Sequence, residues 1–175
     1  RLKDAEAEAY KVRPAEESDL PFIASLYEAA AARYLVTCRR DAVQWRHELS
    51  GRHWMSQNCY MLRIIETPAG ERVGYLAHSA RLSGPRLGVV ALELVPGLSW
   101  QAVTPAVLRY LVAAGRELRA KTPDGEECHT IVFYLGDTHP AYTVLPSGFA
   151  PPYGGYAFLV RVPDVPALLR HIAPV

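Results

Sequence analysis

VVALELVPGLSWQAVTPAVLRYL, residues 89–111, is the stretch that decides the fold. Its opening residues are apolar except for Glu93, which predicts a central strand covered on both faces. A Pro-Gly pair ends this strand. A helix is expected to start at the capping residue Thr104, with Pro105 in its first position, where proline is best tolerated. Such a strand-to-helix corner can bind phosphate, because the N–H groups that open a helix lack intrahelical partners and attract anions.

The regions on either side of this corner predict a mixed fold. Strands are expected at residues 10–13, 60–67, 72–79, 130–135 and 156–162. Helices are expected after Ser18-Asp19, between Asp41 and Gly51, at residues 140–145 and from Pro166 onward. Antiparallel hairpins come first and a strand–helix–strand unit follows. This order predicts an α/β fold of the mixed α+β kind, with a central, mostly antiparallel sheet and helices on both faces.

Composition excludes several classes of protein. The 175 residues suit one domain, and half of them are apolar, which is typical of a globular chain. A net charge of +1 argues against nucleic acid as a partner, and no apolar run is long enough to cross a membrane. The three cysteines, Cys38, Cys59 and Cys128, are widely spaced and favour a reducing, cytoplasmic setting. No spacing of His or Cys predicts a metal site.

Both ends of the chain indicate that it belongs to a longer protein. It opens on Arg1 rather than Met, and residues 1–9 have the composition of a linker. We expect one domain over residues 10–162 and a linker or helix over residues 163–175 that leads to a following domain. Neighbouring domains of the same chain are therefore expected partners, together with a possible homo-oligomer.

The order of elements and four short motifs resemble the GNAT superfamily of acyl-CoA N-acyltransferases. Residues 12–20 (VRPAEESDL) are similar to its first strand and helix, and Gly74-Tyr75 to its third strand. Val95-Pro96 matches the end of its fourth strand, and Ser147-Gly148-Phe149 the Gly-Phe after its last short helix. The resemblance covers about residues 10–162. It implies acetyl-CoA as the acyl donor and an amine as the acceptor.

The resemblance also implies a cofactor loop after the fourth strand. The family's signature, Q/R-x-x-G-x-G/A, aligns with residues 101–106 (QAVTPA). Residues implied to bind acetyl-CoA are Leu94, Val95, Gln101, Ala102, Val103, Thr104 and Ala106. Thr104 replaces a glycine, which would let a phosphate approach the backbone closely, and Pro105 lacks an N–H donor. Both departures argue against tight binding of the diphosphate.

Two catalytic residues are implied in the same way. A carboxylate on the family's fourth strand can act as the base for the amine, and Glu93 matches it. Burial raises the pKa of a carboxyl group, which suits a base near neutral pH. Alternatively, Glu93 lies on a splayed strand and faces a solvated cleft or pairs with an arginine, and the sequence favours this structural role. The family's general-acid tyrosine aligns with Val144, which leaves Tyr142 nearby as the candidate acid.

The C-terminal tail, residues 160–175, resembles the linker of tandem GNAT proteins that carry a sterol-carrier-like domain. Their second GNAT domain is commonly degenerate at the cofactor loop. Two functions therefore stay open: an N-acetyltransferase domain with a departing cofactor loop, or a non-catalytic GNAT-fold scaffold or oligomerisation domain within a larger acetyltransferase. A binder of an unrelated small ligand is a weaker third hypothesis.

Other residues have a functional and a structural interpretation. His139 could form an acid–base pair with Asp137, although Asp and His are also common turn residues. Arg39-Arg40 could contact a CoA phosphate or form a solvated face. Trp100 could stack on a ligand or pack the corner.

Overall fold

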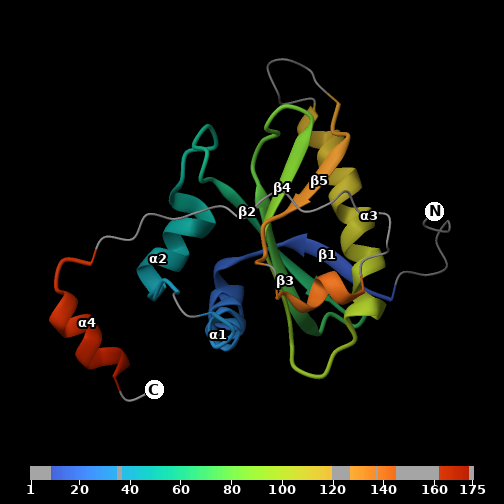
Figure 1. Ribbon diagram of the computed structural model, residues 1–175. Coiled ribbons are helices and arrows are strands. Elements are labelled where there is room, and N and C mark those ends of the chain that lie inside the picture. The colour runs from blue at the N-terminus through green and yellow to red at the C-terminus, as the bar shows by residue number, and fades with distance from the viewer. Residues whose placement is uncertain (1–8, 35–36, 120–126, 137, 145–161, 174–175) are drawn as a thin grey trace. The chain divides into compact units, whose positions relative to one another are not determined.

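The computed structural model describes residues 9–34, 37–119, 127–136, 138–144 and 162–173. The chain divides into two compact units, residues 1–145 and 146–175, which are described separately. The first unit contains a five-stranded sheet with the strand order β1-β2-β3-β4-β5. Helices lie on both of its faces (Figure 1). The predicted α/β class, with a mixed and mostly antiparallel sheet, is confirmed.

The strands pair antiparallel except for the last pair, β4 and β5, which is parallel. They are β1 (Lys11–Pro14), β2 (Tyr60–Glu66), β3 (Arg72–Ser79), β4 (Arg86–Leu94) and β5 (Thr130–Phe133). The helices of the first unit are η1 (Glu17–Asp19), α1 (Leu20–Ala31), α2 (Ala42–Arg46), η2 (His47–Gly51), α3 (Trp100–Arg119) and η3 (Pro140–Thr143). The expected β2–β3 hairpin is therefore present, with Gly70 in the left-handed conformation its turn requires.

Each face of the sheet has its own apolar core. The α3 face packs Leu87, Val89, Leu92 and Leu94 of β4 against the buried side of α3. The opposite face packs Ile64 and Tyr75 of the sheet against Leu20, Ile23 and Trp45 of α1 and α2. Strand β4 contributes to both cores, as its apolar sequence predicts.

A β-bulge in β4 determines which residues face which core. Ala77 pairs with Ala91 and His78 pairs with Val89, so Val90 is an extra residue with no partner on β3. Because side chains alternate along a strand, one extra residue moves all later side chains to the other face. Leu92 and Leu94 therefore join the α3 core, and Glu93 faces α1 and α2. Without the bulge, Glu93 would point into the α3 core.

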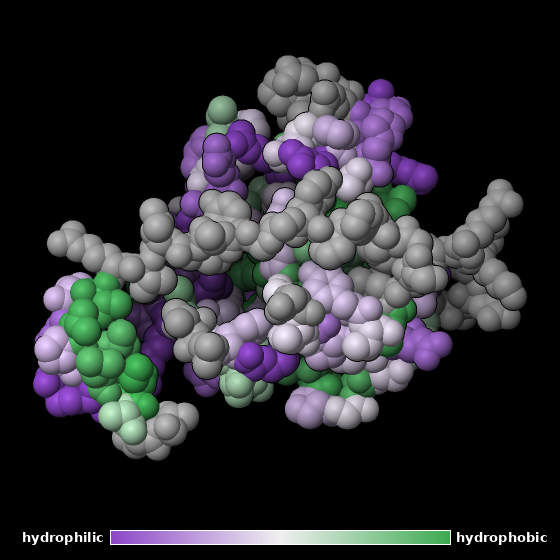
Figure 2. Space-filling view, viewed as in Figure 1, coloured by the Kyte–Doolittle hydropathy of each residue, from purple (hydrophilic) through white to green (hydrophobic). Residues whose placement is uncertain are grey.

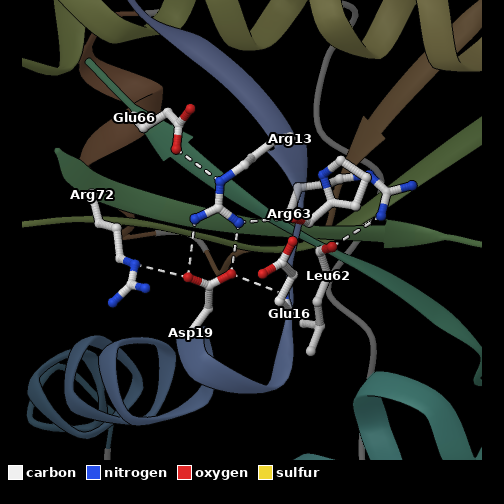
Figure 3. A network of polar contacts seen from close by, with 8 residues as sticks. Arg13, Glu16, Asp19, Leu62, Arg63, Glu66 and Arg72 are labelled. Carbon is white, nitrogen blue, oxygen red and sulfur yellow. Dashed lines mark hydrogen bonds and ion pairs between the residues drawn. The ribbon is translucent and has the colours of Figure 1, made fainter. Parts of the chain in front are cut away.

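The buried carboxylate of Asp19 connects the short helix η1 to strands of the sheet. Asp19 is fully buried and accepts two hydrogen bonds from Arg13 of β1, at 2.7 and 3.0 Å. It also pairs with Arg72 of β3 at 2.7 Å, and Arg13 reaches on to Glu66 of β2 (Figure 3). Burial works against ionisation of Asp19. The hydrogen bonds from Arg13 and from the Glu16 N–H outweigh it, together with the charges of Arg13 and Arg72, and lower the pKa of Asp19.

The start of α3 differs from the prediction. The helix begins at Trp100, so Thr104 and Pro105 lie inside it rather than opening it. Ser99 precedes the helix, and its carbonyl oxygen accepts the N–H groups of Ala102 and Val103 at 3.1 and 3.3 Å. The Thr104 hydroxyl donates back to the carbonyl of Trp100 at 2.7 Å. Burial of Val103 and Thr104 against the sheet favours the extra turn.

The helices expected near Asp41 and at residues 140–145 are present. Asp41 caps α2 through the N–H of Gln44, as expected, and η2 is a π-helix that ends at Gly51. The short helix expected at residues 140–145 is the 3₁₀-helix η3. Ser147-Gly148-Phe149 and residues 156–161 of the last expected strand lie outside the described residues.

The second unit contains α4 (Val165–Ile172), which Asp164 caps through the N–H of Ala167. The helix expected from Pro166 onward is therefore present and begins one residue earlier, at Val165. Its apolar side chains, Val165, Leu168, Leu169 and Ile172, are exposed and gather along one face of the helix (Figure 2). Among the described helices of the whole chain, none is long and apolar enough to cross a membrane.

Candidate functional site

The sheet opens between β4 and β5. The two strands pair only from Arg86 and Thr130 to Val89 and Phe133, and the N–H of Tyr134 then donates to the carbonyl of Val89 at 2.8 Å. Beyond that point β4 continues with no strand beside it on this side within the described ranges. The opening begins at the bulge, where strands commonly bend and stop pairing.

The register shows which backbone groups line this open edge. The N–H of Val95 donates to the carbonyl of Val73 across the β3–β4 ladder. Since N–H and C=O groups alternate between the two sides of a strand, those of Leu92 and Leu94 point away from β3. Leu94, a predicted cofactor residue, therefore presents its backbone to the opening, whereas the N–H of Val95 is used within the sheet.

His139 lies at the open edge. Its Nε2 donates to the carbonyl of Leu92 at 2.9 Å, and its Nδ1 accepts the N–H of Ala141 at 3.1 Å. These two partners require the tautomer with the proton on Nε2. The ring is buried and meets Trp100 edge to face, with 5.1 Å between ring centroids. Both nitrogens are thus engaged. Asp137, its expected partner, lies outside the described residues.

Glu93 forms an ion pair with Arg33, which lies two residues after the end of α1. Arg33 Nη2 and Glu93 Oε1 are 2.5 Å apart, and His139 Nε2 lies 3.6 Å from the same oxygen. Partial burial disfavours the charged guanidinium, but the hydrogen bond and charge of Glu93 outweigh it and raise the pKa of Arg33. The predicted alternative of pairing with an arginine is therefore present in the structure.

Aromatic side chains pack on the α1/α2 face, the face of the sheet that Glu93 occupies. Tyr75 stands opposite Glu93 in the β3–β4 register and is buried. Tyr27 and Trp45 meet edge to face at 5.3 Å, and Arg40 lies over both rings. The indole N–H of Trp45 is buried and has no hydrogen-bond acceptor in the part of the chain that is described.

Tyr142, the candidate acid, lies beside the same opening. Its hydroxyl donates to the carbonyl of Phe133 at 3.1 Å and accepts the N–H of Leu135 at 3.4 Å. Its ring is 6.2 Å from that of His139. The hydroxyl is therefore held at the end of β5, on the side of the opening opposite β4.

The first turn of α3 remains available for an anion. The N–H groups of Trp100 and Gln101 have no intrahelical partner because they open the helix. Gln101 and Ala102 are exposed, whereas Val103, Thr104 and Ala106 are buried in the core. Pro105 therefore does not remove a donor from the helix opening. The open edge of β4 and this first turn carry backbone N–H and C=O groups that can pair with an extended ligand that has an anionic group.

A second polar cluster lies on the α3 face, away from Glu93. Arg63 donates to the hydroxyl of Tyr110, which hydrogen bonds to Nε2 of His78 at 2.8 Å. Burial lowers the pKa of His78 to about 4, the charge of Arg63 adds to the effect, and a hydrogen bond to the Ser79 carbonyl opposes it. A shallow pocket of about 330 Å³ borders Tyr110 and Val12. No cluster of metal-binding side chains occurs among the residues described.

The sequence does not indicate Arg33 as a site residue, and for His139 it suggests only a pair with Asp137 or a role in a turn. Arg33 follows an alanine-rich helix end and has no motif around it. His139 stands before Pro140, in a stretch typical of a turn. An ion pair between residues 33 and 93 joins segments distant in the chain, so only the fold brings the two groups together.

No known family model matches the chain, and no curated protein is significantly similar to it in sequence. Solved structures share its fold, and three of them are described here. Ribosomal-protein-alanine N-acetyltransferase from Brucella melitensis biovar Abortus 2308 is 16% identical, with a TM-score of 0.60 over 88% of this chain and 100% of that chain. A predicted acetyltransferase with acetyl-CoA from Clostridium acetobutylicum is 13% identical, with a TM-score of 0.55 over 86% and 96%. A possible acetyltransferase from Clostridium difficile 630 is 14% identical, with a TM-score of 0.55 over 89% and 100%. At these identities the likeness concerns the fold, and this chain has the fold of GNAT-type acetyltransferases.

Proposed function

We propose that this chain is a GNAT-type domain that transfers an acetyl group from acetyl-CoA to an amine. The observation that carries the proposal is the edge of β4, which opens at Val90 and leads directly to the first turn of α3. The pantetheine arm of CoA contains amide groups, which can pair with an open strand edge as an added strand does. The diphosphate then meets the N–H groups of Trp100 and Gln101.

The residues around the opening take the following roles in this proposal. Glu93 accepts the proton that the amine must lose before it attacks. The N–H of Leu94 donates to the acyl carbonyl oxygen, where negative charge develops. Tyr142 supplies a proton to the leaving thiolate, for which its hydrogen bond to the Phe133 carbonyl must break. Arg33 keeps the Glu93 carboxylate in place before the amine arrives.

Isothermal titration of acetyl-CoA into the protein tests this proposal. We expect micromolar binding, and no detectable binding would overturn it. Gln101→Glu places a negative charge at the opening of α3 and should weaken binding at least tenfold. Ala113→Glu adds the same charge at an exposed position three turns further along the helix and serves as the matched control.

Two contacts favour a second candidate function, a non-catalytic scaffold or oligomerisation domain. His139 already occupies the carbonyl of Leu92, and Arg33 already occupies Glu93. Both contacts stabilise the folded domain as long as no ligand displaces them, which suits a domain that binds none. This alternative predicts no binding of acetyl-CoA or CoA, together with self-association measurable by light scattering, or binding to a neighbouring domain.

A further inference from the structure

Two consecutive residues after α1 bridge the opening in the sheet. Arg33 pairs with Glu93 on β4, where its Nη2 lies 2.5 Å from Oε1 of the carboxylate. The hydroxyl of Tyr34 donates at 2.7 Å to the carbonyl of Leu135, which lies two residues after the end of β5. The two strands no longer pair at this point. The side chains of Arg33 and Tyr34 therefore connect the β4 side of the opening to the β5 side.

The side chains of Arg33 and Tyr34 also contact each other. The guanidinium carbon of Arg33 lies 5.7 Å from the ring centroid of Tyr34, which is a cation–π distance. Gly136 makes room for the Tyr34 ring, because a Cβ at this position would lie 3.0 Å from Cε1 of the ring. The positive φ of 81° also favours glycine there. Release of either side chain therefore weakens the hold on the other.

The ion pair limits what can replace Arg33 at Glu93. The side chain of Glu93 is 11% exposed and that of Arg33 is 30% exposed. A largely buried carboxylate that loses its cation is left as an uncompensated charge, which is costly. A group that takes the place of the guanidinium must therefore carry a positive charge and an N–H donor. The ammonium form of an amine has both.

Leu135 connects the same bridge to the candidate acid. Its carbonyl accepts the Tyr34 hydroxyl, and its N–H donates to the hydroxyl of Tyr142 at 3.4 Å. The segment that follows β5 thus holds Tyr142 on one side and, through Tyr34, supports the arginine that covers Glu93 on the other. In this arrangement the candidate base and the candidate acid are both engaged by groups of the protein itself.

We propose that Arg33 and Tyr34 form a latch across the opening, which the ammonium group of the acceptor opens by exchanging with the Arg33 guanidinium at Glu93. This inference rests on the proposed acetyl transfer, since it describes how the amine reaches its base. Tyr34 is a positioning residue in this latch, because it acts on Glu93 only through Arg33. The latch keeps the buried carboxylate paired until a cation with N–H groups takes its place.

Cleavage by chymotrypsin after Tyr34 measures release of the latch, because the protease must take the Tyr34 ring into its own binding pocket. We expect propylammonium chloride to speed this cleavage about twofold or more over tetramethylammonium chloride at the same concentration. Both cations carry one charge, but only propylammonium has N–H groups that can pair with Glu93. Cleavage after Trp54, an exposed residue, reports overall unfolding and should be equal in the two salts. Equal rates after Tyr34 would overturn the inference.

Variants of the two latch residues separate ion exchange from packing. Tyr34→Phe keeps a site for chymotrypsin but lacks the anchoring hydroxyl, and cleavage there should be about fivefold faster, the effect of one hydrogen bond. Tyr134→Phe, at an exposed tyrosine, is the matched control and should leave that rate unchanged. Arg33→Gln should be cleaved equally fast in both salts, since no guanidinium remains to be exchanged. A difference between the salts that persists in Arg33→Gln contradicts the exchange.

Separate measurements distinguish the two proposals. A protein that binds acetyl-CoA, but is cleaved after Tyr34 at the same rate in both salts, contradicts the latch alone. Selective acceleration by propylammonium, in a protein to which acetyl-CoA does not bind, contradicts acetyl transfer and supports the exchange at Glu93.

Discussion

The imidazole of His139 donates from Nε2 to the carbonyl oxygen of Leu92 over 2.9 Å, at the point where β4 has lost its neighbour β5. A buried carbonyl at an open strand edge needs a donor, and β5 cannot supply one because it has already turned away. The contact therefore stabilises the opening in the sheet, and it links the segment after β5 to the strand that carries Glu93.

Replacement of His139 by Ala should destabilise the protein. The substitution removes a fully buried ring and leaves both the Leu92 carbonyl and the Ala141 N–H without partners. We expect the free energy of unfolding to fall by about 3 kcal/mol. Urea unfolding followed by circular dichroism measures this. His129→Ala, at an exposed position, is the control and should change little; equal effects of the two variants would contradict the structural role.

His78 should make stability depend on pH between about 6.5 and 4. Its pKa is lowered to about 4 in the folded protein, so the unfolded chain binds more protons in this range. Stability therefore decreases as the pH falls from 7 toward 4. From His78 alone we expect a loss of about 2 kcal/mol between pH 7 and pH 5. Unfolding curves at both pH values measure this loss, and in His78→Gln the difference should shrink by that amount.

The sequence predicted the elements best where local rules determine them. The β2–β3 hairpin follows from alternation on both sides of a Pro-Ala-Gly turn, and the start of α2 follows from Asp41 and Gln44. The predicted start of α3 was wrong. A Thr followed by Pro is typical of a helix start, but Thr104 and Pro105 lie inside a helix that begins at Trp100. The choice was made by burial of Val103 and Thr104 against the sheet, which is a tertiary effect.

Glu93 was singled out because it interrupts an apolar strand, but its environment could not be predicted. Which face it occupies depends on the bulge at Val90, and nothing in the apolar run distinguishes Val90 from its neighbours. Its partner Arg33 lies far away in the chain. The sequence therefore predicts that a glutamate lies on this strand. Only the folded structure shows which face of the sheet Glu93 occupies and that it pairs with Arg33.

Asp19 should control stability in acid. Its pKa is lowered in the folded protein, so its contribution is present above the ordinary carboxyl pKa near 4 and is lost as the pH falls through the lower folded value. Asp19→Asn leaves Arg13 and Arg72 without their shared carboxylate, and we expect a loss of about 3 kcal/mol at pH 7. The difference in free energy of unfolding between the parent protein and the variant, measured by urea unfolding, should become smaller below pH 4. Glu28→Gln, at an exposed position, should show no such convergence.

Pro105 should cost stability without affecting the diphosphate site. It lies inside α3, where it cannot donate to the carbonyl of Gln101, one turn earlier. Pro105→Ala restores that donor and should raise the free energy of unfolding by up to about 3 kcal/mol. The affinity for acetyl-CoA should change less than twofold. A tenfold gain in affinity would instead assign Pro105 to the blocked cofactor loop that the sequence indicates.

Glu93→Gln tests the proposed base with little change in shape. The amide keeps a hydrogen-bond acceptor for Arg33 but cannot accept a proton from the amine. We expect kcat/KM for the amine to fall at least a hundredfold, because general-base catalysis is lost, while the Kd for acetyl-CoA stays within twofold. The control is Glu48→Gln on η2, which removes the half-buried ion pair with Arg52 outside the proposed site. It should leave kcat/KM within twofold. If both variants lose activity in proportion to their stability, Glu93 has a structural role; if Glu93→Gln remains fully active, the amine loses its proton to another group.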